Sequence, residues 1–147
     1  MPHSYAQNYL HAVFSTKERR RIISPETQPK LWAYLAEIGR NNGLQITVAG
    51  GGADHAHLLF LLPAEMPLAK AILLLKANSS KWMNKQKHGF AWQEGYSAFS
   101  VSVSNLDAVT RYIQNQEAHH RKISFEQEYL ALLKKHGVAF DARYVLG

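Results

Sequence analysis

The stretch of sequence that decides the fold runs from His55 to Leu62, reads HAHLLFLL and directly follows Asp54. This mostly apolar run lies between the glycines at 50–52 and Pro63, which is typical of a strand buried in a sheet. Because side chains two apart on a strand share a face, His55 and His57 point the same way. Two imidazoles so placed can bind one divalent ion, and the alternative is two ordinary histidines at a strand edge.

Around this strand the sequence predicts alternating strands and helices. Runs of branched and aromatic residues predict further strands over residues 9–14, 44–49 and 96–103. Capping residues and helical spacing predict helices over residues 25–41, 68–86, about 105–120 and 125–135. The last of these helices follows its capping residue Ser124. The order predicts an α+β fold, a ferredoxin-like or RRM-like antiparallel sheet with helices packed mainly on one face, and with the histidine pair on an interior strand.

The composition limits the classes of protein that fit. With 147 residues, 46% of them hydrophobic, the chain suits a single packed domain over residues 1–147. A net charge of +6 favours a polyanion such as nucleic acid, or an anionic membrane surface. There is no apolar run of the ~20 residues that a membrane span needs. The sequence lacks a signal-peptide pattern and has no cysteine, which fits a reducing cytoplasm.

A second group of polar residues lies in the predicted helix over residues 105–120. Tyr112 and Gln116 are four residues apart and therefore project from the same helical face, while Ile113 lies on a neighbouring stripe suited to the core. An amphipathic helix with a packed tyrosine is the alternative interpretation.

A tyrosine and a metal-binding histidine pair complement each other in attack on a phosphodiester. A phenol with a pKa near ~10 is a poor nucleophile at neutral pH and needs a metal or a base nearby. A metal would also polarise the phosphate, and the amide oxygen of Gln116 could complete its coordination. No Gly-x-x-x-x-Gly-Lys loop is present, so no nucleotide cofactor is expected.

These motifs together carry a family resemblance. The sequence resembles the single-tyrosine HUH transposases of the insertion-sequence 200/605 group, in which a hydrophobic residue separates two metal-binding histidines. The matching stretches are Phe14 to Lys17 (FSTK), Asp54 to Leu59 (DHAHLL), Trp92 to Ser102 (WQEGYSAFSVS) and Tyr112 to His120 (YIQNQEAHH). Ala56 is a small occupant of the hydrophobic position and leaves the ligand spacing intact.

The resemblance implies specific roles. Tyr112 is the implied nucleophile, His55 and His57 are metal ligands, and Gln116 is the third protein ligand. The implied reaction is cleavage and rejoining of single-stranded DNA through a 5′-phosphotyrosine, with Mg²⁺ or Mn²⁺ and with recognition of hairpins near the ends of the element. A homodimer with sites shared between subunits, and a cytoplasmic, nucleoid-associated location in a bacterium or archaeon, are also implied.

The basic and aromatic residues suggest where DNA binds. The candidates for phosphate contacts are Arg19, Arg20, Arg21, Lys76, Lys81, Lys85 and Lys87. Trp82, Phe90 and Trp92 could stack on unpaired bases. A solvated row of lysines and tryptophans in the core are the alternatives, and His119 and His120 fit either a solvated helix end or a DNA contact.

Two other functions remain open. One is a domesticated relative that processes repeated palindromes without moving an element. The other is a catalytically silent nucleic-acid-binding domain on a ferredoxin-like sheet, in which the pairing of Tyr112 with Gln116 is accidental. A two-metal carboxylate transposase is disfavoured because the eleven acidic residues are scattered. A two-histidine phosphoesterase is disfavoured because that class usually has a doubled His-x-Ser/Thr pattern, and only one His-x-His pair is present here.

Overall fold

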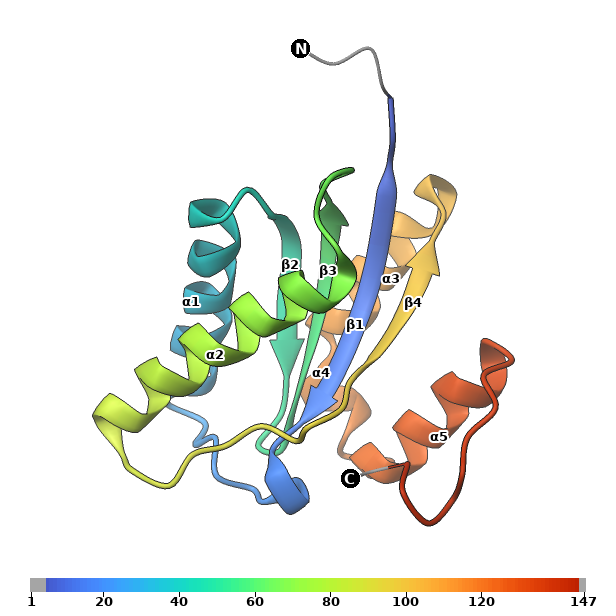
Figure 1. The fold of residues 1–147 in the computed structure, drawn as a ribbon. Coiled ribbons are helices and arrows are strands. Elements are labelled where there is room, and N and C mark those ends of the chain that lie inside the picture. Colours follow the sequence, from blue (N-terminus) through green and yellow to red (C-terminus); the bar gives the residue numbers. More distant parts are fainter. Residues whose placement is uncertain (1–4, 146–147) are drawn as a thin grey trace.

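Four strands form one antiparallel sheet in the order β2-β3-β1-β4 (Figure 1). The computed structural model describes residues 5–145, so the two ends of the predicted domain, residues 1–4 and 146–147, lie outside it. The strands are β1 (Asn8–Ser15), β2 (Gln45–Gly51), β3 (His55–Leu62) and β4 (Ser97–Val101). The predicted α+β class is confirmed, and β3 lies in the interior between β2 and β1.

One face of the sheet carries the larger hydrophobic core. Even-numbered side chains of β1 and β3, such as Phe14 and Phe60, pack there against α1 (Gln28–Asn41) and α2 (Leu68–Gln86). The helix α2 has the predicted bounds, and no helix among residues 5–145 is long and apolar enough to span a membrane. The helix α1 begins at Gln28 rather than at Pro25, because the preceding residues form a turn in which the hydroxyl of Ser24 accepts a hydrogen bond from the amide of Thr27 (3.3 Å).

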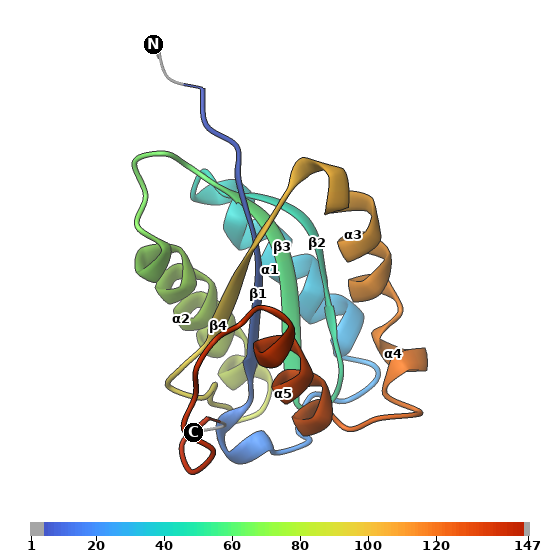
Figure 2. The same ribbon diagram turned by 90° about the vertical axis from the view of Figure 1, so that its right-hand side faces the viewer.

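The opposite face of the sheet carries the histidine pair. The helices α3 (Leu106–Gln114), α4 (Gln116–His119) and α5 (Phe125–Lys135) cover this face (Figure 2). Helices therefore lie on both faces, whereas the sequence analysis expected them mainly on one. The reason is that Val13 and Phe99 also point to this face, and α5 buries them.

The predicted helix over residues 105–120 is interrupted. Val103–Asn105 forms a 3-10 turn, α3 ends at Gln114, and Asn115 has φ −96° and ψ 19° before α4 begins. The last predicted helix is present as α5, with a capping box between Ser124 and Gln127. The break at Asn115 sets where α4, which begins with Gln116, lies relative to α3. The capping box fixes the first turn of α5.

A glycine lets α3 approach the sheet closely. A Cβ atom at Gly50 of β2 would lie 2.6 Å from the carbonyl oxygen of Ile113. The same position on β2 pairs with His57. Gly50 therefore holds the helix segment next to Tyr112 against the strand that neighbours the histidine pair.

Candidate active site

His55 and His57 point from β3 toward α3, α4 and α5. The spacing predicts this shared face, and the two rings have their centroids 5.2 Å apart. Their side chains are 1% and 0% exposed. The ring of Phe125, the first residue of α5, stacks on that of His55 at 4.3 Å. Because β3 is hydrogen-bonded on both sides, the backbone that carries the pair is held in place.

Each of these two rings has a polar partner at its Nδ1 atom. The Nδ1 of His55 lies 2.7 Å from a carboxylate oxygen of Asp54, and the Nδ1 of His57 lies 2.8 Å from the Nε2 of His11 on β1. Both Nε2 atoms consequently face the helices. Partners of this kind orient metal-binding imidazoles. His11 is not among the site residues predicted from the sequence. Its two-residue spacing from Val13 nevertheless places it on the same face of β1 as that buried residue.

Tyr112 and Gln116 reach the same place from α3 and α4. The amide oxygen of Gln116 lies 2.9 Å from the Nε2 of His55. The Tyr112 ring centroid is 5.7 Å from that of His57. The structure thus brings together, within one chain, the residues predicted as nucleophile and ligands. The predicted sharing of sites between two subunits is not needed for this convergence and stays a prediction.

Glu128 of α5 lies at the centre of the cluster. It accepts hydrogen bonds from the phenol of Tyr112 and from the amide of Gln116 (3.0 Å), and its other oxygen lies 3.0 Å from the Nε2 of His57. It is 2% exposed and is the single buried carboxylate among residues 5–145. Glu128 is not among the site residues predicted from the sequence.

His119 and His120 complete the cluster. The Nε2 of His120 lies 2.9 Å from the amide oxygen of Gln116 and 3.0 Å from Glu128, and its Nδ1 faces the carbonyl of Ile123 at 2.9 Å. The Nε2 of His119 lies 3.4 Å from Glu128 and makes no hydrogen bond. Both side chains thus contact the other residues of the cluster. Neither of the two predicted roles, a solvated helix end or a DNA contact, is decided by these contacts.

Burial keeps His11 and His57 neutral. Burial and the neighbouring His57 lower the pKa of His11 to about 3. Burial also lowers the pKa of His57 to about 4, against the opposing hydrogen bond and charge of Glu128. Near pH 7 both rings are therefore uncharged, and the neutral imidazole is the form that binds metals.

Glu128 sets the protonation of its other neighbours. Burial alone would raise its pKa, but hydrogen bonds from His120 and His57 hold that pKa well below its usual range. Burial alone would lower the pKa of His120, and the hydrogen bond to Glu128 reverses this and raises it. Burial, followed by the hydrogen bond to Glu128, raises the pKa of the Tyr112 phenol. The resting arrangement is an ionised carboxylate that holds a protonated phenol.

The donor atoms fit a divalent metal. Ligand atoms of His55, His57 and Glu128 lie within 4.8 Å of one another, as do those of His119, His120 and Glu128. Imidazole nitrogens together with carboxylate and amide oxygens suit Mn²⁺ and other transition ions, whereas Mg²⁺ prefers oxygen alone. This donor set supports binding of a divalent ion and leaves its identity open.

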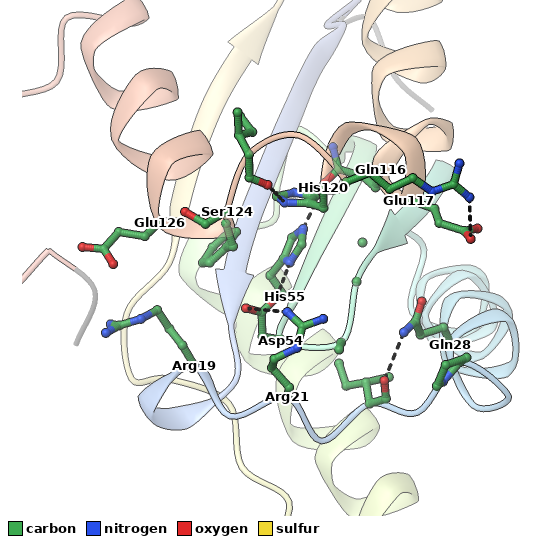
Figure 3. A pocket seen from close by; sticks show the side chains of 18 of the residues that line it. Arg19, Arg21, Gln28, Asp54, His55, Gln116, Glu117, His120, Ser124 and Glu126 are labelled. Atoms are coloured by element: carbon green, nitrogen blue, oxygen red, sulfur yellow. Dashed lines mark hydrogen bonds and ion pairs between the residues drawn. The ribbon is translucent and has the colours of Figure 1, made fainter.

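A cavity of about 650 Å³ opens beside the cluster. In Figure 3, Arg19 and Arg21 lie on one side of it, Gln116 and His120 on another, and His55 between them. Glu128 and Tyr112 do not line it. The cavity therefore reaches His55, Gln116 and His120 directly, whereas the phenol of Tyr112 lies against Glu128 of α5.

The predicted DNA-contact residues fall into different surroundings. Trp92 is 8% exposed, and its indole donates a hydrogen bond to Ser79 (2.9 Å), so a base could stack on it only if the core opened. The neighbouring Phe90 is buried against it. The ammonium of Lys76 donates to the carbonyls of Gln93 (2.8 Å) and Gly95 (2.6 Å), and burial lowers its pKa to about 8.

The other candidates are more accessible. Arg20 and Arg21 are exposed and Arg19 is half-buried. The end of α2 carries three exposed lysines, Lys81, Lys85 and Lys87. This helix lies on the face of the sheet opposite the histidines (Figure 1). Trp82 is half-buried and stacks on Tyr34 at 4.9 Å. Of the predicted DNA-contact residues, only Arg19 and Arg21 line the cavity beside the cluster.

The comparisons with known proteins identify the family. Residues 4–116 match the family described as "Transposase IS200 like", so the chain belongs to the IS200-like transposase family. It is similar to the transposase for insertion sequence element IS200 of Salmonella typhimurium and to that of Salmonella typhi. Each is 26% identical over 114 residues, which cover 72% of this chain and 74% of the relative. The family assigns transposase function to the protein.

Solved structures share the fold. A candidate transposase from Deinococcus radiodurans R1 superposes with a TM-score of 0.64 at 23% identity, covering 79% of this chain and 96% of that one. A REP-associated tyrosine transposase bound to a REP hairpin superposes with a TM-score of 0.60 at 14% identity, covering 82% of this chain and 73% of that one. This chain therefore shares the fold of both solved structures.

Proposed function

We propose that this transposase cuts and rejoins single-stranded DNA with Tyr112 as the nucleophile. The observation that supports this most directly is the convergence of Tyr112, His55 and His57 around Glu128 within one chain. A silent nucleic-acid-binding domain has no need for a buried polar cluster of this kind, because burying polar and charged groups costs stability.

The proposed reaction conserves the energy of the phosphodiester. The phenolic oxygen attacks phosphorus, the bond from phosphorus to the 3′ oxygen breaks, and that oxygen takes up the proton that leaves the phenol. The 5′ end of the strand stays on Tyr112 as a phosphotyrosine. Attack by another 3′-hydroxyl reverses the step at a new junction, so no ATP is needed.

When bound, a divalent ion would supply the activation that the phenol lacks. His55 and His57 would hold it, with Gln116 as a further ligand, and the ion would polarise a nonbridging phosphate oxygen. We favour Mg²⁺ or Mn²⁺ for turnover. In the resting site Glu128 keeps the proton on Tyr112, so the phenol depends on this activation before it can attack.

For the DNA we propose a single strand that enters the cavity beside His55. Arg19 and Arg21 line this cavity and would neutralise phosphates, while the lysines at the end of α2 form a separate basic surface. Hairpin recognition rests on the family resemblance and on the structural neighbour that is bound to a REP hairpin. We also propose a cytoplasmic, nucleoid-associated enzyme and a homodimer.

The experiment is a covalent-adduct assay. The protein is incubated with labelled single-stranded DNA from the flanks of its gene, with Mg²⁺ or Mn²⁺, and a denaturation-resistant adduct is sought. We expect the adduct with the unmodified protein and its loss in Tyr112→Phe. The matched control Tyr34→Phe alters a half-buried tyrosine on the other face of the sheet and should keep the adduct. An adduct that survives in Tyr112→Phe would reject the proposed nucleophile.

A second candidate function keeps the same chemistry. The fold shared with a REP-associated tyrosine transposase favours, as the alternative, a domesticated enzyme that processes repeated palindromes. Cleavage of palindromic repeats scattered through the genome, without cleavage at the ends of the gene's own flanks, would support this alternative.

A further inference from the structure

We propose that Glu128 is a metal ligand, and that its carboxylate joins the bound ion to Tyr112. This inference rests on the proposed metal-dependent function and assigns a role to α5. The family match ends at residue 116, so α5 lies outside the matched region. The proposal makes this helix part of the catalytic centre.

The carboxylate of Glu128 lies close to both histidines of the pair. One oxygen of Glu128 lies 3.0 Å from the Nε2 of His57 and 3.7 Å from the Nε2 of His55. Neighbouring ligands around an ion with bonds of ~2.1 Å are themselves ~3 Å apart, so a small movement would seat one ion against all three atoms. The other carboxylate oxygen accepts the hydrogen bond from the phenol of Tyr112.

Hydrogen-bond acceptors surround both ring nitrogens of His55. Its Nδ1 faces the Asp54 carboxylate, and its Nε2 faces both the amide oxygen of Gln116 and the carboxylate of Glu128. A neutral imidazole has one N–H, so in the neutral form of His55 one ring nitrogen presents a lone pair to an oxygen acceptor. A cation beside the Nε2 satisfies that lone pair and the facing oxygens together.

The amide of Gln116 cannot relieve this excess of acceptors. Its nitrogen already donates to Glu128, which leaves its oxygen toward His55 and His120. The ring of His120 has its Nδ1 against the carbonyl of Ile123, so its Nε2 is the donor available to Gln116 and Glu128 only when the ring carries both protons.

The packing of α5 holds the Glu128 carboxylate in place. Phe125 and Tyr129 are buried on either side of Glu128 in sequence, and Phe125 stacks directly on His55. The capping box of Ser124 and Gln127 fixes the first turn of the helix. A carboxylate held in this way keeps its position, as a metal ligand must, whereas a carboxylate on a solvated helix face does not.

The test is the affinity for Mn²⁺, measured by calorimetry on the full chain without DNA. Glu128→Gln keeps the size of the side chain and removes the charge, and we expect its affinity to fall by at least about tenfold. Glu126→Gln, which makes the same change at an exposed position of α5, is the matched control and should bind as the unmodified protein does. Unchanged or tighter binding by Glu128→Gln would overturn the proposal, because Glu128 would then be only a counter-charge for His120.

A second variant covers the case in which Glu128→Gln does not fold. Glu128→Asp keeps the charge and withdraws the oxygens, so we expect weaker Mn²⁺ binding than in the unmodified protein. Equal affinity in a folded Glu128→Asp protein would overturn direct coordination.

The adduct assay separates this inference from the proposed function. A Tyr112 adduct formed by a Glu128→Gln protein that binds Mn²⁺ normally would contradict the inference alone. No Mn²⁺ binding by the unmodified protein would contradict both the inference and the metal-dependent function.

Discussion

The Nε2 of His11 lies 2.8 Å from the Nδ1 of His57, across the pairing of β1 with β3. For the Nε2 of His57 to offer its lone pair to a metal, its Nδ1 must carry the proton, and His11 must accept it through its own Nε2. With a metal on the Nε2, this hydrogen bond would fix the tautomer of His57; in the metal-free protein it holds the direction of the ring while the Nε2 faces Glu128. Both rings are neutral at pH 7 because burial depresses their pKa values.

We therefore predict that His11 positions the metal ligand. His11→Ala should weaken Mn²⁺ binding by about 10- to 100-fold, as the loss of such a partner typically does. His11→Gln, whose amide oxygen can still accept from His57, should restore part of the affinity. Calorimetry measures both, and the unfolding free energy in the presence of a chelator reports the purely structural effect. Equal affinities in the two variants and the unmodified protein would contradict the role.

A second prediction concerns the contact between β2 and α3. In Gly50→Ala the new Cβ would meet the carbonyl oxygen of Ile113 at 2.6 Å, so α3 must move. We expect a loss of about 1–3 kcal/mol in unfolding free energy from the overpacking. Displacement of Tyr112, which precedes Ile113, should slow adduct formation by up to about 100-fold, since catalysis is sensitive to ~1 Å.

The control for this variant is Gly137→Ala. Gly137 has φ +68° and nothing within 4 Å of the added Cβ, so its substitution introduces backbone strain without displacing a helix. It should cost a similar amount of stability and leave the adduct rate unchanged. A matching fall in the adduct rate of both variants would show that stability, and not the position of Tyr112, determines the rate.

Periodicity predicted the parts of the site that lie on single elements. The shared face of His55 and His57, and the strand that carries them, follow from the two-residue repeat. Tyr112 and Gln116 were paired by helical spacing and converge on the histidines, although the helix breaks between them at Asn115. Their convergence within one chain depends on how α3 packs on β2, which local patterns do not encode.

Glu128 could have been found from the sequence. Phe125, Tyr129 and Leu133 form the buried stripe of α5, and Glu128, three residues after Phe125, lies inside that stripe. A carboxylate at a core position needs partners, and its presence there indicates a polar site. What the stripe could not identify is the partner, because the contact with His57 spans 71 residues of sequence.

A third prediction separates the two basic surfaces. If the single strand enters beside His55, Arg21→Ala should weaken binding of a single-stranded oligonucleotide and reduce the slope of log affinity against log salt by ~0.7, the loss of one phosphate contact. The matched control is Lys85→Ala on the opposite face, which should keep the slope. Fluorescence anisotropy over a range of salt concentrations measures it. A reduced slope in Lys85→Ala alone would move the strand to α2.

Lys76 should behave differently from both residues. Its ammonium already donates to the carbonyls of Gln93 and Gly95, so it is not available to a phosphate without breaking these bonds. Lys76→Met should therefore lower the unfolding free energy and leave the salt slope unchanged. A smaller slope at unchanged stability would instead support the predicted DNA contact.

A fifth prediction follows from the depressed pKa values of His11 and His57, which fall from an ordinary value near ~6.5 to about 3 and about 4. In this interval the unfolded chain binds more protons than the folded protein, so stability is fully present above pH ~6.5 and is lost as the pH falls. The raised pKa of His120 acts in the opposite sense, but its contribution is complete by pH ~6.5. Denaturant unfolding of the metal-free protein between pH 6.5 and 5 should therefore show falling stability.

Each buried imidazole contributes up to about 1.4 kcal/mol per pH unit, and His11→Gln, which lacks one of the two rings, should show the smaller slope. The matched variant is His88→Gln, which replaces an exposed histidine. If both variants lose stability with pH as steeply as the unmodified protein, His11 is not neutral in the fold, and its assignment as the acceptor for His57 is wrong.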